Sequence, residues 1–220
     1  MGQTWLEGGP FLEVSFLLNE VRNDKRTILQ IVNKILELNT IQAAEENIEE
    51  RAGFFEVGYD YDDESNVKMH SFELPLYIFS PIKRKSLLKI DRISSNALMV
   101  NFLFFGSVYD APEWGQIGIR KKDVHWFILF LKNLYSIFDF KVGGIAIERD
   151  IIDLFKCHEG YPSECYLFEK LNPPDFLKED IGFGVILWNN KYQMLDNIPF
   201  PVEGVGNDGV LINIGNSFSI

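Results

Sequence analysis

The residues with the widest chemical repertoire are Cys157 and Cys165, with His158 directly after the first cysteine. Structural zinc sites use paired ligands, commonly two cysteines a few residues apart with a second pair elsewhere in the chain. Adjacent side chains such as those of Cys157 and His158 tend to point apart, and the sequence has no second pair. A cysteine nucleophile needs an activating base, and any distant histidine would satisfy so loose a test. We therefore predict no metal site and no catalytic residue, and we expect the cysteines to be thiols near a helix end.

A glycine-rich segment near the C-terminus, Gly204 to Gly209, matches the dinucleotide-binding pattern G-x-G-x-x-G. That pattern works only between a strand and a helix, because the amides at the helix N-terminus bind the pyrophosphate. The residues after Gly209 read VLINIGNSF, which is typical of a strand. We therefore interpret the glycines as a hairpin turn and predict no nucleotide cofactor.

The acidic run from Asp60 to Glu64 resembles the start of a calcium-binding loop. Such a loop requires glycine at its sixth position and glutamate at its twelfth, and this chain has Ser65 and Ser71 there. The calcium motif therefore fails. A looser cation site, a solvated acidic turn and a functional acidic patch remain as alternatives.

Asp139 and Lys141 have the carboxylate-plus-lysine arrangement that metal-dependent nucleases use around a phosphate, and Glu113 is a candidate second carboxylate. So short a pattern occurs by chance in many chains. Three further acids between residues 148 and 153 fit an ordinary junction between a strand and a helix, since acids are favourable at a helix start.

Two acidic segments also contain large aromatic side chains. Tyrosine and tryptophan on loops are common interface anchors, and neighbouring acids attract a basic partner. For the second segment, the alternative is a tryptophan folded back on the core. The predicted partner-binding residues are Tyr59, Asp60, Tyr61, Asp62, Asp63 and Glu64 in the first segment and Tyr109, Asp110, Glu113 and Trp114 in the second.

The formal charge of −11 over 220 residues constrains the partner. Proteins that bind nucleic acids rely on clustered lysine and arginine. Here the basic clusters are short, at residues 83–89 and 120–122, and acids outnumber them across the chain. We therefore predict no nucleic-acid partner and expect attraction to a basic protein.

We infer the cellular compartment from the lack of a secretory signal, a membrane span and a disulfide framework in the sequence. The first eighteen residues contain two glutamates and no basic start, which argues against a secretory signal. A membrane span needs about 20 apolar residues, and the longest strongly apolar run is far shorter. With only two cysteines there is no disulfide framework. We expect a soluble cytoplasmic protein without a membrane partner.

Hydrophobic periodicity predicts the elements that must position these residues. Strands are predicted at residues 11–18, 54–61, 72–79, 97–105, 116–120, 141–148, 183–188 and 210–214. Helices are predicted at residues 24–38, 41–51, 122–138 and 150–156. The third helix is apolar on most of its circumference, so we expect it to be almost fully buried, with Trp126 and Phe127 against the strands.

The order of these elements predicts an α+β fold, a mixed or largely antiparallel sheet with helices packed on it, because strands and helices do not alternate regularly. The main domain is predicted at residues 1–175, and a β-rich extension at 176–220 packs on it. The alternative is one continuous domain.

These observations favour a protein-binding module. Its most concrete form is an immunity or antitoxin type of inhibitor that neutralises a basic partner such as a bacterial toxin. Two alternatives remain open: an enzyme with an unrecognised site, such as a metal-dependent hydrolase, and a structural or homo-oligomeric module without a ligand.

Overall fold

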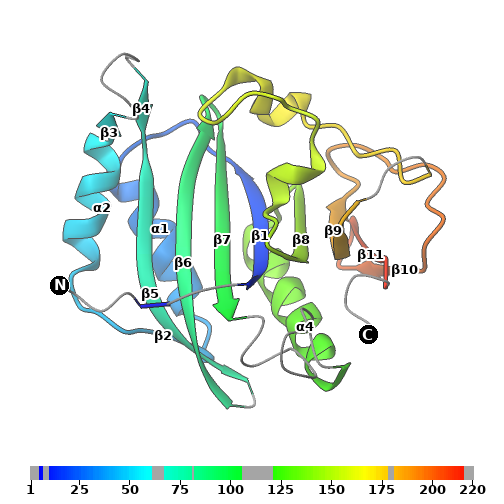
Figure 1. Ribbon diagram of the computed structural model, residues 1–220, viewed down its shortest axis with the longest axis horizontal. Helices are drawn as coiled ribbons and strands as arrows, with labels where there is room; N and C mark the ends of the chain where they lie inside the picture. Colours follow the sequence, from blue (N-terminus) through cyan, green and yellow to red (C-terminus); the bar gives the residue numbers. More distant parts are fainter. Residues whose placement is uncertain are drawn as a thin grey trace.

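A nine-stranded antiparallel sheet forms the centre of the protein (Figure 1). The computed structural model describes residues 5–6, 10–60, 67–80, 82–105, 121–177 and 181–215. The sheet has the order β10-β11-β9-β8-β1-β7-β6-β5-β2, and β3 pairs with β4 in a separate ribbon. The strands are β1 (Phe11–Asn19), β2 (Ile41–Ala43), β3 (Tyr59–Asp60), β4 (Lys68–Met69), β5 (Ser71–Ser80), β6 (Ile82–Ser94), β7 (Ala97–Phe105), β8 (Val142–Ile147), β9 (Phe183–Asn189), β10 (Val202–Val205) and β11 (Gly209–Asn213).

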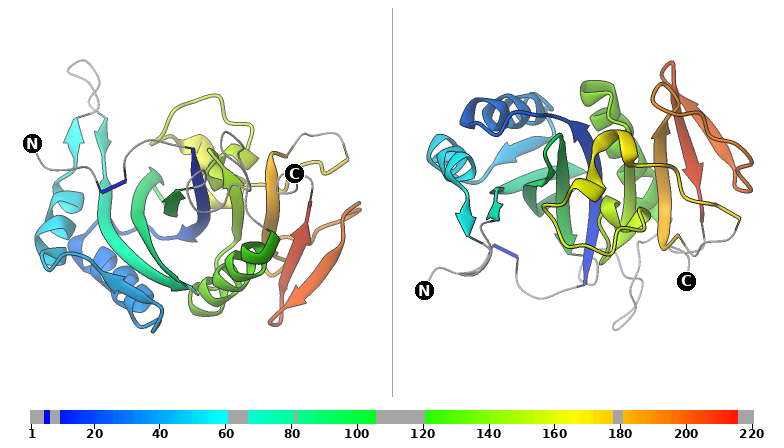
Figure 2. Two further views of the ribbon diagram at one scale, coloured as in Figure 1. Left: turned by 60° about the horizontal axis from the view of Figure 1, so that its bottom comes forward. Right: turned by 90° about the horizontal axis from the view of Figure 1, so that it is seen from above.

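Different layers cover the two faces of the sheet (Figure 2). The helices lie on one face and enclose the larger core. The other face is covered near β1, β6 and β8 by a segment with three short 3-10 helices, which encloses a second core. The helices are α1 (Lys25–Leu36), α2 (Ile48–Val57) and α4 (Lys121–Phe138), and the 3-10 helices are η1 (Ile151–Leu154), η2 (Glu164–Tyr166) and η3 (Phe168–Lys170). The predicted α+β class is therefore confirmed, and every described strand pairing is antiparallel.

Strand β1 shows how one segment serves both cores. Side chains alternate between the faces of a strand, so Leu12, Val14 and Phe16 enter the core under the helices. Leu17 belongs to the second core, and Glu13 and Ser15 share its face of the sheet. An otherwise apolar strand thus places two polar groups on the face opposite the helices.

The helix predicted at residues 41–51 is wrong at its start, and the strand predicted at 54–61 is helical over residues 54–57. Ile41 is buried and pairs with Ile78, so this segment forms β2 at the sheet edge. Helix α2 begins later, runs through Gly53 and ends at Gly58, whose φ of 68° suits glycine. The aromatic content of residues 54–57 favoured a strand locally, but burial of Phe55 against the sheet fixes a helix.

Strand β6, which contains the basic cluster at residues 83–85, was not predicted from the sequence. The alternation of the strand turns Arg84 inward, where it is 3% exposed and forms an ion pair of 3.4 Å with Asp123 of α4. The central cation of that cluster is therefore a buried structural group.

Helix α4 corrects the expectation of an almost fully buried helix. Phe127 and Leu134 are fully buried, whereas Leu129 is 46% exposed and His125 is exposed. Trp126 is half-buried and stacks on Phe130 with ring centroids 5.2 Å apart. The helix is a covering layer with one buried face. No described helix has the length and apolar character needed to cross a membrane.

The glycine-rich segment forms the predicted hairpin turn. Val205 pairs with Gly209 across it, and Gly206 has a φ of 61°. Through β11 and β9, this hairpin continues the sheet beyond β8, so residues on both sides of position 175 belong to one sheet. The helix predicted at residues 150–156 is the shorter 3-10 helix η1.

Candidate functional site

A group of exposed apolar side chains lies on α2 and the strand after it. Phe54 is 66% exposed, Val57 65% and Tyr59 56%. On a helix, residues three and four apart are neighbours, so Glu50, Phe54 and Val57 form one outward stripe. Nothing lies within 4 Å of the position that a Cβ at Gly53 would occupy, so the stripe contains an open notch. We call Glu50, Gly53, Phe54, Glu56, Val57, Tyr59 and Asp60 the α2 surface.

The rear of α2 fixes this surface in place. Ala52 and Phe55 are fully buried and anchor the helix to the core. Nδ1 of His70 lies 2.8 Å from the carbonyl oxygen of Phe55, in the last turn of the helix, where a ring N–H satisfies an otherwise free acceptor. A Cβ at Gly58 would lie 2.9 Å from the His70 ring, so this close approach requires glycine.

The acids of the α2 surface are free, in contrast to those at its edge. Glu49 forms an ion pair of 3.3 Å with Lys25, and Glu45 forms one with Arg51. The side chains of Glu50, Glu56 and Asp60 are exposed and make no ion pair or hydrogen bond within the part of the chain that the structure describes. The surface thus combines unpaired negative charge with exposed apolar area, a combination that suits a basic protein partner.

Two of the ten predicted partner-binding residues, Tyr59 and Asp60, lie on this surface. The other eight are outside the described residues: Tyr61, Asp62, Asp63, Glu64, Tyr109, Asp110, Glu113 and Trp114. Sequence reasoning missed Phe54 and Val57 because the strand predicted there would alternate their faces. The helical spacing of Glu50, Phe54 and Val57 was the signal that could have found them.

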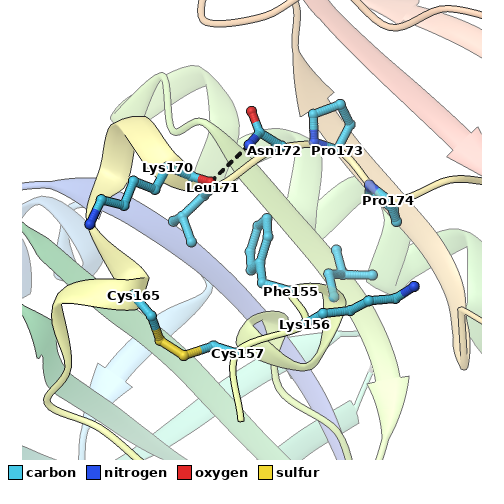
Figure 3. A pocket seen from close by; sticks show the side chains of 10 residues that line it. Phe155, Lys156, Cys157, Cys165, Lys170, Leu171, Asn172, Pro173 and Pro174 are labelled. Carbon is cyan, nitrogen blue, oxygen red and sulfur yellow. Dashed lines mark hydrogen bonds between the residues drawn. A yellow bond between two sulfur atoms is a disulfide. The ribbon is translucent and has the colours of Figure 1, made fainter. Parts of the chain in front are cut away.

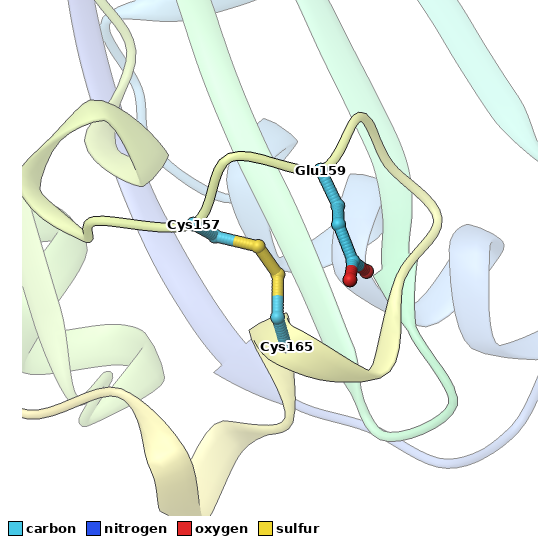
Figure 4. Close-up of side chains that lie close together, drawn as sticks. All are labelled: Cys157, Glu159 and Cys165. Atoms are coloured by element: carbon cyan, nitrogen blue, oxygen red, sulfur yellow. A yellow bond between two sulfur atoms is a disulfide. The ribbon is translucent and has the colours of Figure 1, made fainter.

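Cys157 and Cys165 form a disulfide, which corrects the expectation of thiols (Figure 4). The bond closes a loop that carries Glu159, and the two sulfur atoms and a carboxylate oxygen of Glu159 lie within 4.8 Å of one another. Three such ligand atoms could hold a soft metal only after reduction, because a thiolate and not a disulfide sulfur is the ligand. His158 is not part of this group.

A pocket of 280 Å³ lies beside the disulfide (Figure 3). Phe155 and Leu171 turn toward its interior, whereas the ammonium groups of Lys156 and Lys170 point away from it. A second, open pocket of 540 Å³ lies along α1. A catalytic pocket usually combines apolar walls with a few converging polar groups, and the first pocket lacks that convergence.

The carboxylate-plus-lysine pair does not converge on a common point. Lys141 is 3% exposed and donates a hydrogen bond of 2.7 Å to the carbonyl oxygen of Phe168. Asp139 instead accepts from Asn189 at 2.9 Å and from Lys191 at 2.7 Å. Both residues have structural partners that account for them.

A polar cluster occupies the sheet face opposite the helices. Strand pairing places Ser15 opposite Asn101, and Asn101 opposite Lys89. Glu13 lies two residues before Ser15 on β1, and Asp91 lies two residues after Lys89 on β6, so both share this face. We call Glu13, Ser15, Lys89, Asp91 and Asn101, together with Asp150 and Tyr161 from the covering segment, the sheet-face cluster.

Hydrogen bonds link part of this cluster. The Asn101 amide donates to Glu13. The Lys89 ammonium lies 3.2 Å from Oδ2 of Asp91, and the Tyr161 hydroxyl donates to the same oxygen at 3.4 Å. Asp150 accepts from the amide of Ile152 at 3.0 Å and caps η1. That capping contact agrees with the expected junction between strand and helix.

Burial and mutual repulsion shift the protonation of the cluster. Loss of solvent, together with repulsion from Asp153, Glu13 and Asp91, raises the pKa of Asp150 to about 7. Burial likewise raises the pKa of Glu13, although the Asn101 hydrogen bond lowers it. Burial alone would lower the pKa of Lys89, but the Asp91 carboxylate raises it above its ordinary value. The cluster therefore contains more buried carboxylate than the nearby cation neutralises.

Comparison of the chain with protein-family models, with curated proteins and with solved structures finds no match, so the function has to be inferred from the chemistry of these surfaces.

Proposed function

We propose that this protein is a binding module for a basic protein partner and that the α2 surface makes the contact. In its most concrete form it is an immunity or antitoxin type of inhibitor of a partner such as a bacterial toxin. The observation that carries the proposal is the exposure of Phe54, Val57 and Tyr59, each more than half exposed, among unpaired acids. Exposed apolar groups with a polar rim mark interaction sites.

The aromatic groups supply the short-range part of the binding energy. Phe54 and Tyr59 have few rotatable bonds, so their burial at an interface costs little conformational entropy. The notch at Gly53 leaves room for a partner side chain between Glu50 and Val57. Filling such a notch excludes water around the aromatic anchors.

The charge of −11 supplies long-range attraction. A cationic surface is drawn toward the negative protein before contact, which raises the association rate. Free carboxylates at Glu50, Glu56 and Asp60 then direct the encounter to α2. Salt weakens this attraction beyond a Debye length of about 8 Å at physiological ionic strength.

Cytoplasmic location remains part of the proposal, and the disulfide bears on it. Disulfides persist in oxidising compartments and are rare in the cytosol. A cytoplasmic inhibitor would carry Cys157 and Cys165 as thiols in the cell. Trapping thiols with an alkylating reagent during lysis, followed by mass spectrometry, distinguishes the two states.

The proposal is tested by comparative capture with four forms of the full chain: wild type, Phe54→Lys, Glu56→Lys and Met194→Lys. Met194 is 74% exposed in the loop between β9 and β10, at the opposite end of the sheet from α2, so its variant is a control for an added surface charge. We expect a basic protein to be retained by the wild type and the Met194→Lys variant and lost by both α2 variants. Circular dichroism checks that all four forms are folded.

Two results would overturn the proposal. Equal retention by all four forms would place the contact away from α2. Self-association of the wild type, abolished by Phe54→Lys and without any basic partner, would make this surface a homo-oligomer contact and favour the structural-module alternative.

A further inference from the structure

We infer that the sheet-face cluster is a binding site for a guanidinium group, provided by a small cationic compound or by an arginine side chain. The inference starts from three polar atoms that have no hydrogen-bond partner within the described structure: Ser15 Oγ, Asp91 Oδ1 and Asn101 Oδ1. Their residues are 0%, 1% and 4% exposed. Buried polar groups are nearly always paired, so three orphans on adjoining strands require an explanation.

Strand register places these atoms on one face of three adjoining strands. Ser15 and Asn101 are direct partners across β1 and β7, and Asn101 is the partner of Lys89 across β7 and β6. Asp91 follows Lys89 by two residues and contacts its ammonium group. All three orphans therefore belong to the same face, beneath the covering segment that contributes Asp150 and Tyr161.

The three unpaired atoms lack hydrogen-bond donors as partners. The donors of the cluster already contact other oxygens: the Asn101 amide donates to Glu13, and both Lys89 and Tyr161 contact Oδ2 of Asp91. What remains consists of two acceptor oxygens and one hydroxyl. The complementary ligand must supply several N–H or O–H donors.

The negative charge of the cluster indicates that the ligand is a cation and not only a hydrogen-bond donor. Ordered water would satisfy the hydrogen bonds, but it would leave the repulsion among Glu13, Asp91 and Asp150, which adds to the effect of burial in raising the pKa of Asp150. Asp153 and Glu148 add to the negative field, and the Tyr166 hydroxyl faces the same acids. Lys89 and the exposed Arg149 are the cations near these groups.

The spacing of the ligand atoms favours an organic cation over a metal ion. Magnesium and calcium gather six or more oxygens at short distances. In the described residues, three acidic, histidine or cysteine ligand atoms lie close enough together only at Cys157, Glu159 and Cys165. A guanidinium group is planar, carries five N–H donors and can bridge acceptors on adjoining strands.

Glu13, Lys89, Leu103 and Tyr161 are half-buried and border the cluster, while the orphan atoms lie beneath them. Glu13 and Asp91 are the carboxylates that would accept charge-assisted hydrogen bonds, and Asn101 and Ser15 would accept neutral ones.

The test uses arginine amide as the free-compound probe and a blocked pentapeptide with a central arginine as the side-chain probe. Citrulline versions of both are the controls, since they keep the shape and lose the charge. We expect each arginine probe that fits to bind the folded full chain about ten-fold more tightly than its citrulline counterpart, measured by calorimetry at pH 8. Binding of the amide alone identifies a free compound, and preferential binding of the peptide identifies a partner side chain.

Variants locate the site. Asp91→Asn and Ser15→Ala should weaken arginine binding, about ten-fold and about three-fold respectively, and Asp196→Asn in an exposed loop should not. Ser15→Ala removes an unpaired buried hydroxyl, so it should fold at least as well as the wild type and keeps the test valid if Asp91→Asn unfolds. Phe54→Lys should leave the arginine affinity unchanged, which separates this inference from the proposed α2 contact.

Equal binding of arginine and citrulline probes would overturn the inference. So would full affinity in Ser15→Ala together with Asp91→Asn. Stronger thermal stabilisation by magnesium or calcium than by arginine amide would replace guanidinium by a metal ion.

Discussion

Replacement of Asp150 by asparagine should make the protein more stable at neutral pH. The side chain caps η1 through the amide of Ile152, and asparagine can accept the same hydrogen bond. The substitution therefore removes a buried negative charge and keeps the cap. The stabilisation should depend strongly on pH, because the pKa of Asp150 rises from 3.8 to about 7 on folding.

The sign follows from proton binding. Between about pH 4 and pH 7 the unfolded chain has lost the proton at this position while the folded chain keeps it, so stability falls as pH rises through that window. One unit of pKa corresponds to about 1.4 kcal/mol. With a shift of about three units, and allowing for the remaining solvent contact of a half-buried carboxyl, Asp150→Asn should gain about 2–4 kcal/mol at pH 8 and little at pH 4.

Urea unfolding of both proteins at pH 4, 5, 6, 7 and 8 measures this difference. Asp196→Asn, in an exposed loop, is the matched control and should show no pH-dependent gain. Parallel stability curves for wild type and Asp150→Asn across the whole pH range would refute the buried-charge reasoning. A guanidinium compound at saturating concentration should narrow the gap at pH 8, since it neutralises the same charge.

Three further predictions test the fold. Phe127→Ala should cost about 3–5 kcal/mol in urea unfolding because Phe127 is fully buried, whereas Leu129→Ala on the exposed face of the same helix should cost less than about 1 kcal/mol; equal losses would contradict the orientation of α4. Gly53→Ala should stabilise α2 by up to about 1 kcal/mol, since a Cβ there meets open space, and a loss of stability would contradict the open notch. Reduction of the Cys157–Cys165 bond, which spans eight residues, should lower the free energy of unfolding by about 2–3 kcal/mol. The stability of the Cys157→Ser variant should not change with reductant. An unchanged melting temperature of the wild type on reduction would refute this prediction.

Elements with strong periodicity could be predicted from the sequence. Ile28, Ile31, Val32 and Ile35 repeat at helical spacing after the N-cap Asp24, and α1 forms there. Strands β1, β5 and β7 also lie close to their predicted positions, because apolar and β-branched residues fill both faces of buried strands. In these cases local preference and tertiary burial favour the same structure.

Strand β6 and the bounds of helix α2 depend on distant partners and were therefore not predicted correctly. Lys83 to Lys85 looks solvated in sequence, yet Arg84 is buried because Asp123 arrives from α4. The residues before α2 have helical preferences, but pairing of Ile41 with Ile78 turns them into a sheet edge. Tertiary context overrides propensity in both segments.

The sheet-face cluster could be predicted only in part. Glu13 and Ser15 interrupt an apolar strand, and Asn101 interrupts another, which was a readable signal of polar groups on buried strands. The register that places Ser15 beside Asn101, and Asn101 beside Lys89, joins segments far apart in the chain. The Cys157–Cys165 bond could not be predicted either, because the spacing of the two cysteines alone does not decide between thiols, a metal site and a disulfide.

The central claim, that the α2 surface binds a basic partner, is tested most directly by binding kinetics with the captured protein at low and high salt. Glu50→Lys and Glu56→Lys should mainly slow association, and raised salt should do the same to the wild type. Phe54→Ala and Tyr59→Ala should mainly raise the dissociation rate. At an anchor residue the loss of binding free energy should be about 2 kcal/mol. An association rate indifferent to salt and to both charge reversals, with dissociation unchanged in both alanine variants, would contradict the account.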